Sequence, residues 1–234
     1  MSYELEYIAF IIIGYCAGSV FFAKLWGYVF TKRDITLEAP DHNPGTFNAF
    51  EIGGFWCGVL TVIGDLLKGI LPVALCLYFV DSYAHNEVLM ALVMLAPIIG
   101  HIFPLYNHFK GGKGIAVTFG VLLGYAPDFK VALLLAIVFL VFSLVLIIRP
   151  DYYKTMATFI VAAVISPFVG YRLAIVLAYF AAAIAVCTRL ILSDEEKGAF
   201  SVSFFKWNII TAGNSADESE ISEAEKRKEK EIKP

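Results

Sequence analysis

The segment HFKGGKG, at positions 108–114, carries the residue types that bind phosphate groups. Its glycines let backbone N–H groups turn toward one point and allow a ligand to approach closely. Lys110 and Lys113 add positive charge, and a helix that we expect from Ile115 onward adds N–H groups and the positive end of its dipole. This pattern suits an anionic oxygen cluster such as phosphate. A basic loop that contacts lipid headgroups is an equally good interpretation of the segment taken alone.

A second polar segment, HNPGTFN at positions 42–48, also offers groups that could bind a substrate. Asn43, Pro44 and Gly45 are typical of a turn. Asn43 and Asn48 supply neutral donors and acceptors that suit hydroxyl or phosphate groups. An ordinary turn before the next helix explains the pattern better on its own, but the segment is expected on the same membrane face as residues 108–114.

Charged and polar residues also occur inside apolar stretches. Asp65 and Lys68 are three residues apart, so they share one face of a helix and can form an ion pair. Charges within a membrane segment are costly and are functional candidates by default. We favour a structural ion pair for Asp65 and Lys68, and an orienting role for His101 beside the 108–114 segment.

Composition identifies the elements that must hold these residues. The chain has 234 residues, 59% of them hydrophobic and 17% charged, with a mean hydropathy of +0.73. Helices are expected because each backbone amide inside a bilayer needs an internal partner, and about 20 apolar residues span the hydrocarbon core. The sequence predicts an all-α polytopic membrane protein with about seven transmembrane helices. The predicted helices cover about 5–30, 53–80, 88–105, 115–126, 131–148, 155–169 and 172–192, the fourth being short for a span.

Basic residues predict the orientation of these helices. If there are seven crossings, four basic clusters fall on one side of the membrane: Lys32 with Arg33, Lys110 with Lys113, Arg149 with Lys154, and the segment EAEKRKEKEIK. We therefore expect the N-terminus outside and the C-terminus in the cytoplasm, in the plasma (inner) membrane of a bacterium, with the polar site on the cytoplasmic side. A membrane-integral domain is expected over residues 1–212 and a charged, disordered tail over 213–234.

Other chemistry finds little support in the sequence. No group of His, Asp or Glu has the spacing of metal ligands, so we expect no metal and no cofactor. The net charge of −3 gives no reason to expect a nucleic-acid partner. No side chain stands out as a covalent nucleophile.

Taken in order, these segments resemble the bacterial acyl-phosphate-dependent glycerol-3-phosphate acyltransferase family. The resembling residues are Gly18-Ser19, Asn43-Pro44-Gly45 with Asn48, Gly64-Asp65 with Lys68-Gly69 and Pro72, Gly100-His101 with Phe103, and Phe109 to Gly114. The resemblance covers about the first half of the chain. It implies an enzyme of phospholipid synthesis that moves a fatty acyl group from acyl phosphate to glycerol 3-phosphate, giving lysophosphatidic acid and phosphate.

The resemblance also implies site residues. Lys113 would be catalytic, because it would neutralise the charge that develops on a phosphate group. The residues that would bind phosphate or substrate are Asn43, Gly45, Asn48, Lys110, Gly111, Gly112 and Gly114. Acyl phosphate, glycerol 3-phosphate or a related acceptor, and membrane lipid would be the partners.

The chain departs from the family pattern at the expected acceptor end. Asp41 stands where the pattern has a serine, and Thr36 and Glu51 stand where it has arginines. New carboxylates would repel the doubly charged glycerol 3-phosphate. The pattern's C-terminal His and Asn are missing after the last apolar run. An alternative is therefore a non-catalytic relative that binds acyl phosphate or lipid in a regulatory role; a small-solute transporter fits less well, because inverted repeats are not apparent.

Overall fold

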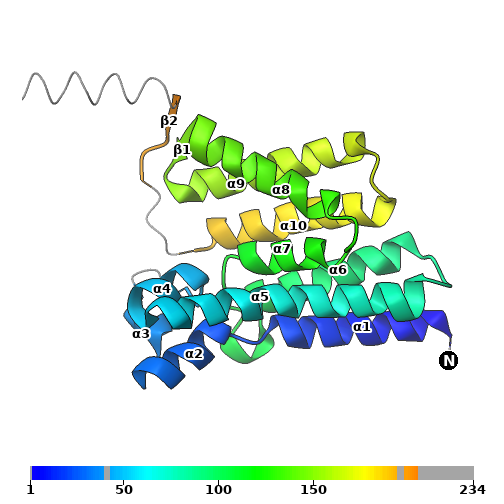
Figure 1. Cartoon of the computed structure of the whole chain (residues 1–234), viewed down its shortest axis with the longest axis horizontal. Coiled ribbons are helices and arrows are strands. Elements are labelled where there is room, and N and C mark those ends of the chain that lie inside the picture. The colour runs from blue at the N-terminus through cyan, green and yellow to red at the C-terminus, as the bar shows by residue number, and fades with distance from the viewer. Residues whose placement is uncertain (1, 40–42, 194–197, 205–234) are drawn as a thin grey trace, which may run out of the picture.

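Long helices run side by side in the computed structural model, and α2, α3 and α4 gather beyond one end of α1 (Figure 1). The structure describes residues 2–39, 43–193 and 198–204. Helix α6 packs between α1 and α10, and α5 packs against α4, α7 and α1. The α-helices are α1 (Tyr3–Gly18), α2 (Phe22–Thr31), α3 (Ile35–Glu38), α4 (Thr46–Gly53), α5 (Phe55–Cys76), α6 (Glu87–Ile102), α7 (Ile115–Leu123), α8 (Lys130–Leu140), α9 (Asp151–Ile165) and α10 (Leu173–Ile191).

Five helical segments of the described residues are long and apolar enough to cross a membrane. They are Tyr3–Thr31, Phe55–Asp81, Glu87–Asn107, Asp151–Val169 and Leu173–Ile191. Short π or 3-10 turns extend α5 (η1, Leu77–Asp81), α8 (η3, Val141–Val145) and α9 (η4, Ser166–Val169), and a 3-10 turn (η2, Leu105–Asn107) follows α6 after Phe103 and the extended Pro104. Helices α7 and α8 are shorter, so the count of seven crossings and the orientation of the termini stay predictions. The predicted tail at 213–234 lies outside the described residues.

The fifth predicted helix ends earlier than the sequence suggested. Helix α8 continues through η3, and the chain then forms strand β1 (Leu146–Arg149), which pairs antiparallel with β2 (Ser201–Phe204). The all-α prediction is therefore wrong for these residues, although the fold is mostly helical. Pro150 disfavours a helical conformation at Arg149, and the β-branched pair Ile147 and Ile148 favours an extended one.

The first apolar run is also broken, between Gly18 and Phe22. The break leaves backbone carbonyls without the amide partners that a continuous helix would supply, which is costly inside a membrane. Side chains from other helices fill this need: the Tyr106 hydroxyl donates to the Ser19 carbonyl at 2.5 Å, and Lys68 Nζ donates to the Val20 carbonyl at 2.9 Å. The break thus depends on tertiary partners.

Glycines allow α1 and α6 to approach closely. Gly14 and Gly18 are four residues apart on one face of α1 and lie against Pro97 of α6. A Cβ atom built on Gly18 would lie 2.1 Å from the Pro97 carbonyl oxygen, and one built on Gly100 would lie 2.1 Å from the Tyr15 carbonyl oxygen. Small residues are the usual means by which membrane helices bring their backbones together.

At the end of the bundle away from α2–α4, a buried carboxylate, Asp81, and two partly exposed charged residues join four elements. Arg172 donates to Asp81 at 2.6 Å and to Glu87 at 2.8 Å, and the Tyr7 hydroxyl donates to Asp81 at 2.7 Å. The hydrogen bond to Asp81 raises the pKa of Arg172, which keeps its charge in place. This network fixes the start of α10 to α1, η1 and α6.

We predict that Gly18→Val destabilises the protein by at least about 2 kcal/mol, because the added side chain would overlap the Pro97 backbone, which cannot move without displacing α6. Reversible unfolding in detergent, followed by circular dichroism, measures this change. The control is Ile12→Val, since Ile12 is 59% exposed on the same helix. Equal stability of the two variants would contradict the close approach of α1 and α6.

Candidate active site

A cavity of about 820 Å³ lies between α4, α5, α7, α8, α9 and the ends of α6 and α10. Its walls combine two kinds of side chain. The polar and charged lining residues are Asn43, Thr46, Asn48, Glu51, Asp65, His101, Lys113, Asp151, Tyr152, Lys154 and Thr155. The apolar lining residues are Phe47, Val62, Leu66, Ile115, Ala116, Phe119, Phe139 and Leu190. Such a cavity suits a molecule with an ionic part and an aliphatic part.

The N-terminal turn of α7 faces this cavity. Gly114 has φ of +85°, a conformation that glycine adopts without strain, and it leads directly into the helix. Gly114, Ile115 and Ala116 all line the cavity beside Lys113. Within the described part of the chain, the Gly114 N–H has no hydrogen-bond acceptor. The positive end of the helix and the residue Lys113 therefore border the same space.

The three residues before Lys113 are placed differently from the sequence expectation. The Gly112 N–H donates to the His101 carbonyl at 3.0 Å, and the Gly111 carbonyl accepts two hydrogen bonds from Arg189. Neither glycine lines the cavity, and neither does Lys110, which is exposed. The Gly112 N–H, which the sequence suggested as a phosphate donor, is thus bonded to a protein carbonyl in this structure, and a role for Gly112 in binding phosphate stays a prediction.

The start of the loop is tightly wound. His108 and Phe109, with φ of 51° and 60°, are consecutive non-glycine residues in the left-handed region. The Phe109 N–H donates to the Pro104 carbonyl, and the Lys110 N–H donates to the Asn107 carbonyl. Such conformations persist only where surrounding contacts impose them, and they are common at ligand-binding loops.

A chain of buried polar groups lies behind the loop. Lys68 Nζ is 2.7 Å from Asp65 Oδ1 and 2.7 Å from His101 Nδ1. With the Val20 carbonyl, these two partners use all three donors of an ammonium group. Because Lys68 can only donate, Nδ1 of His101 must accept, which places the His101 proton on Nε2. The predicted Asp65–Lys68 ion pair is present, and both side chains are almost fully buried.

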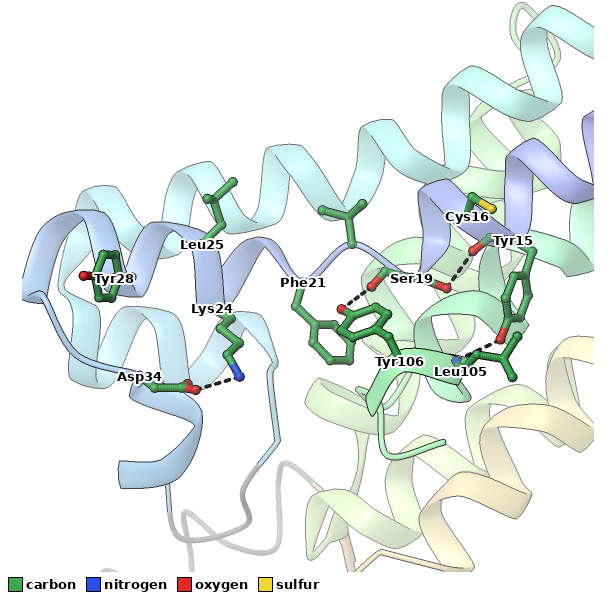
Figure 2. A pocket seen from close by; sticks show the side chains of 11 residues that line it. Tyr15, Cys16, Ser19, Phe21, Lys24, Leu25, Tyr28, Asp34, Leu105 and Tyr106 are labelled. Atoms are coloured by element: carbon green, nitrogen blue, oxygen red, sulfur yellow. Dashed lines mark hydrogen bonds and ion pairs between the residues drawn. The ribbon is translucent and has the colours of Figure 1, made fainter. Parts of the chain in front are cut away.

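The outer side of the same helix break forms a second, mainly apolar groove of about 760 Å³ (Figure 2). Phe21 lies in its wall, with its ring centroid 6.3 Å from that of His101, and so separates the groove from the buried chain. At one end, Lys24 is 2.7 Å from Asp34 (Figure 2). Burial raises the pKa of the Asp34 carboxyl, but hydrogen bonds from Lys24 and Thr36 lower it by more, so the net pKa is below its ordinary value. The Thr36 hydroxyl thus donates a hydrogen bond to Asp34, and Thr36 does not line the larger cavity.

The turn at Asn43 brings its two predicted binding residues together. The Asn43 carbonyl accepts from the Gly45 N–H and from the Asn48 side-chain amide, each at 2.8 Å. Asn43 and Asn48 are buried, and both line the cavity with Gly45. Asp41 lies outside the described residues.

Sequence reasoning missed the contribution of α9 and α10. Asp151 and Lys154, which form an ion pair at 2.7 Å, line the cavity from α9. Their spacing of three residues at a helix start was the available signal. Arg189 of α10 reaches the loop at Gly111, and nothing in the sequence indicated this contact.

Comparison with known proteins agrees with this geometry. The sequence profile of the family described as "Glycerol-3-phosphate acyltransferase" matches residues 8–196. This chain belongs to the glycerol-3-phosphate acyltransferase family. The match extends well beyond the first half of the chain, where the resembling segments lie.

Individual relatives carry the same name. A glycerol-3-phosphate acyltransferase of Cupriavidus metallidurans is 39% identical over 120 residues, which is 51% of this chain and 59% of the relative. One from Legionella pneumophila (strain Philadelphia 1) is 37% identical over 119 residues, covering 51% of this chain and 41% of the relative. The chain thus spans about half the length of the curated relatives it matches.

Two solved structures of PlsY, described as an integral membrane glycerol 3-phosphate acyltransferase, share the fold. The glycerol 3-phosphate form aligns with a TM-score of 0.66 at 25% identity, over 79% of this chain and 88% of that one. The lysophosphatidic acid form aligns with a TM-score of 0.60 at 26% identity, over 79% of this chain and 87% of that one. The chain is accordingly a membrane protein of the acyltransferase family.

We predict that Lys68→Met in this acyltransferase family member lowers stability by about 3–5 kcal/mol, because it leaves the buried Asp65 carboxylate without its cation. The double variant Asp65→Asn/Lys68→Met should recover a large part of that loss. The free energies of unfolding of these two variants and of Asp65→Asn alone, measured in detergent, complete a double-mutant cycle with the wild type. If the two substitutions proved additive, the ion pair would not be the reason for burying these groups.

Proposed function

We propose that the chain transfers a fatty acyl group from acyl phosphate to the first hydroxyl of glycerol 3-phosphate, giving lysophosphatidic acid and inorganic phosphate. The observation that carries this proposal is one cavity in which Lys113 and the start of α7 adjoin apolar walls. An acyl phosphate has the same two parts, an anionic head and an aliphatic chain. The reaction would take place at the cytoplasmic face of a bacterial plasma membrane.

The chemistry needs little from the protein besides position and charge. The acceptor oxygen attacks the acyl carbonyl carbon, the bond from that carbon to the phosphate oxygen breaks, and the hydroxyl proton leaves with the phosphate. Because acyl phosphate is a mixed anhydride with a good leaving group, no covalent intermediate on the protein is required.

Lys113 is the residue best placed to stabilise the charge that develops. Lys113 lines the cavity beside the first N–H groups of α7, and donors held in place before the reaction would need little reorganisation as charge builds on the phosphate oxygens. Phe119 and Phe139, with Leu66, form an apolar wall along which the acyl chain would lie. Asn43 and Asn48 would then face the acceptor.

The acceptor end favours a second candidate function. Glu51 lines the cavity, and Asp151 lies there as well, although Lys154 is paired with it. A carboxylate near a doubly charged acceptor weakens its binding. A relative that binds acyl phosphate or lipid without turnover, in a regulatory role, would tolerate this charge.

We expect Lys113→Ala to lower kcat for acyl transfer by about a hundred- to a thousand-fold, because it removes a fixed charge at the reacting phosphate. Lys110→Ala is the matched control, since Lys110 lies on the same loop but outside the cavity lining. The assay measures phosphate release from a long-chain acyl phosphate with glycerol 3-phosphate and purified protein. Equal losses in both variants would contradict the assignment. Wild-type protein that binds acyl phosphate without turnover would favour the regulatory alternative.

We also expect Glu51→Gln to lower KM for glycerol 3-phosphate by about five-fold, because a unit charge a few ångströms away in water changes binding by about 1 kcal/mol. KM for acyl phosphate should change little. Initial rates with each substrate varied in turn separate the two effects. An unchanged KM for glycerol 3-phosphate would show that Glu51 does not face the acceptor.

A further inference from the structure

The last helix reaches across to the phosphate loop through Arg189. Nε and Nη2 of its guanidinium donate to the Gly111 carbonyl at 3.1 and 2.9 Å. Two donors of one rigid, permanently charged group on a single oxygen fix the direction of that oxygen more firmly than one neutral donor would. Arg189 is half-buried and lies in the last turn of α10.

The other edge of the same peptide unit is held by α6. The peptide bond between Gly111 and Gly112 carries the carbonyl that Arg189 holds and the N–H that donates to the His101 carbonyl at 3.0 Å. Because a peptide unit is planar, partners at both edges determine its orientation completely. Glycines are otherwise free to rotate such a unit.

Close packing explains why this unit consists of glycines. A Cβ atom on Gly111 would lie 2.0 Å from the His101 carbonyl oxygen, and one on Gly112 would lie 2.1 Å from His101 Nε2. The loop is thus pressed onto the end of α6. Arg189 is the contact from α10 that holds its carbonyl.

We propose that Arg189 is a positioning residue, which locks the Gly111–Gly112 peptide and thereby directs Lys113 and the first turn of α7 into the cavity. Lys113 follows the locked unit directly, so the direction of the backbone at Lys113 and Gly114 is set by it. Rotation of this peptide unit would break the hydrogen bond between Gly112 and His101. It would also turn the electron-rich Gly111 carbonyl away from Arg189. The catalytic consequence of this lock rests on the acyl transfer proposed above; the lock itself does not.

Hydrogen–deuterium exchange tests the lock without reference to activity. Full-length Arg189→Ala in detergent should show about ten- to a hundred-fold faster exchange in a peptide that contains Gly112, as expected when a charge-assisted hydrogen bond is lost. Arg33→Gln, an exposed arginine paired with Glu38, is the control and should leave this peptide unchanged. Unchanged exchange in a folded Arg189→Ala protein would overturn the proposal. If that variant does not fold, Arg189→Lys replaces it, with a smaller increase expected.

Kinetics then test the consequence for Lys113. Arg189→Ala should lower kcat for acyl transfer at least about ten-fold while KM for glycerol 3-phosphate stays within about two-fold. Added guanidinium ion, at concentrations that do not unfold the protein, should restore part of the activity of Arg189→Ala and none of Lys113→Ala. The proposal would be overturned if guanidinium restored no activity and Arg189→Ala lowered only the stability of the protein. Arg189 would then have a purely structural role. An inactive wild type would count against the acyl-transfer proposal, and the exchange experiment would still decide whether Arg189 locks the loop.

Discussion

The placement of one buried ammonium group, that of Lys68, constrains much of this structure. A charge in a membrane bundle is tolerated only when every donor has a partner. Lys68 meets this condition with a carboxylate on its own helix, a histidine on α6, and a backbone carbonyl that is exposed because the first helix is broken. Lys68 therefore links three features of the fold: the break in the first helix, the orientation of His101 and the position of α5.

This arrangement leads directly to the loop before α7. The His101 carbonyl accepts a hydrogen bond from the Gly112 N–H. His101 Nε2 lies where a Cβ atom on residue 112 would otherwise be. The glycines of the loop thus allow close packing on α6, which is a different role from the donation of N–H groups to a ligand. The N–H groups that face the cavity belong to the next residues, where Gly114 leads into α7.

The cavity itself joins features that usually occur apart. Its cationic end at Lys113 resembles a phosphate site of a water-soluble enzyme, whereas its walls of Phe119, Phe139 and Leu66 suit a lipid chain. Two carboxylates, Glu51 and Asp151, also line this cavity, and Glu51 stands where the family pattern has an arginine. The charge of these side chains bears directly on whether the chain turns over substrate or only binds it, which are the two functions proposed above.

The sequence by itself determined the class of the protein, its main helices and the segments that form the site. These conclusions rest on features that do not depend on how the chain folds. They are the long apolar runs, the three-residue spacing of Asp65 and Lys68, and the order of the glycine-rich segments. Only the tertiary structure decided which groups of those segments are available, because availability depends on contacts between residues far apart in sequence. Thus the Gly112 N–H is taken by His101, the Gly111 carbonyl is taken by Arg189 from the last helix, and Asp151 enters the cavity from α9. The end of the α8 segment has both origins: Pro150 and the β-branched Ile147 and Ile148 disfavour a helix locally, and β1 pairs with a strand more than fifty residues later in the chain.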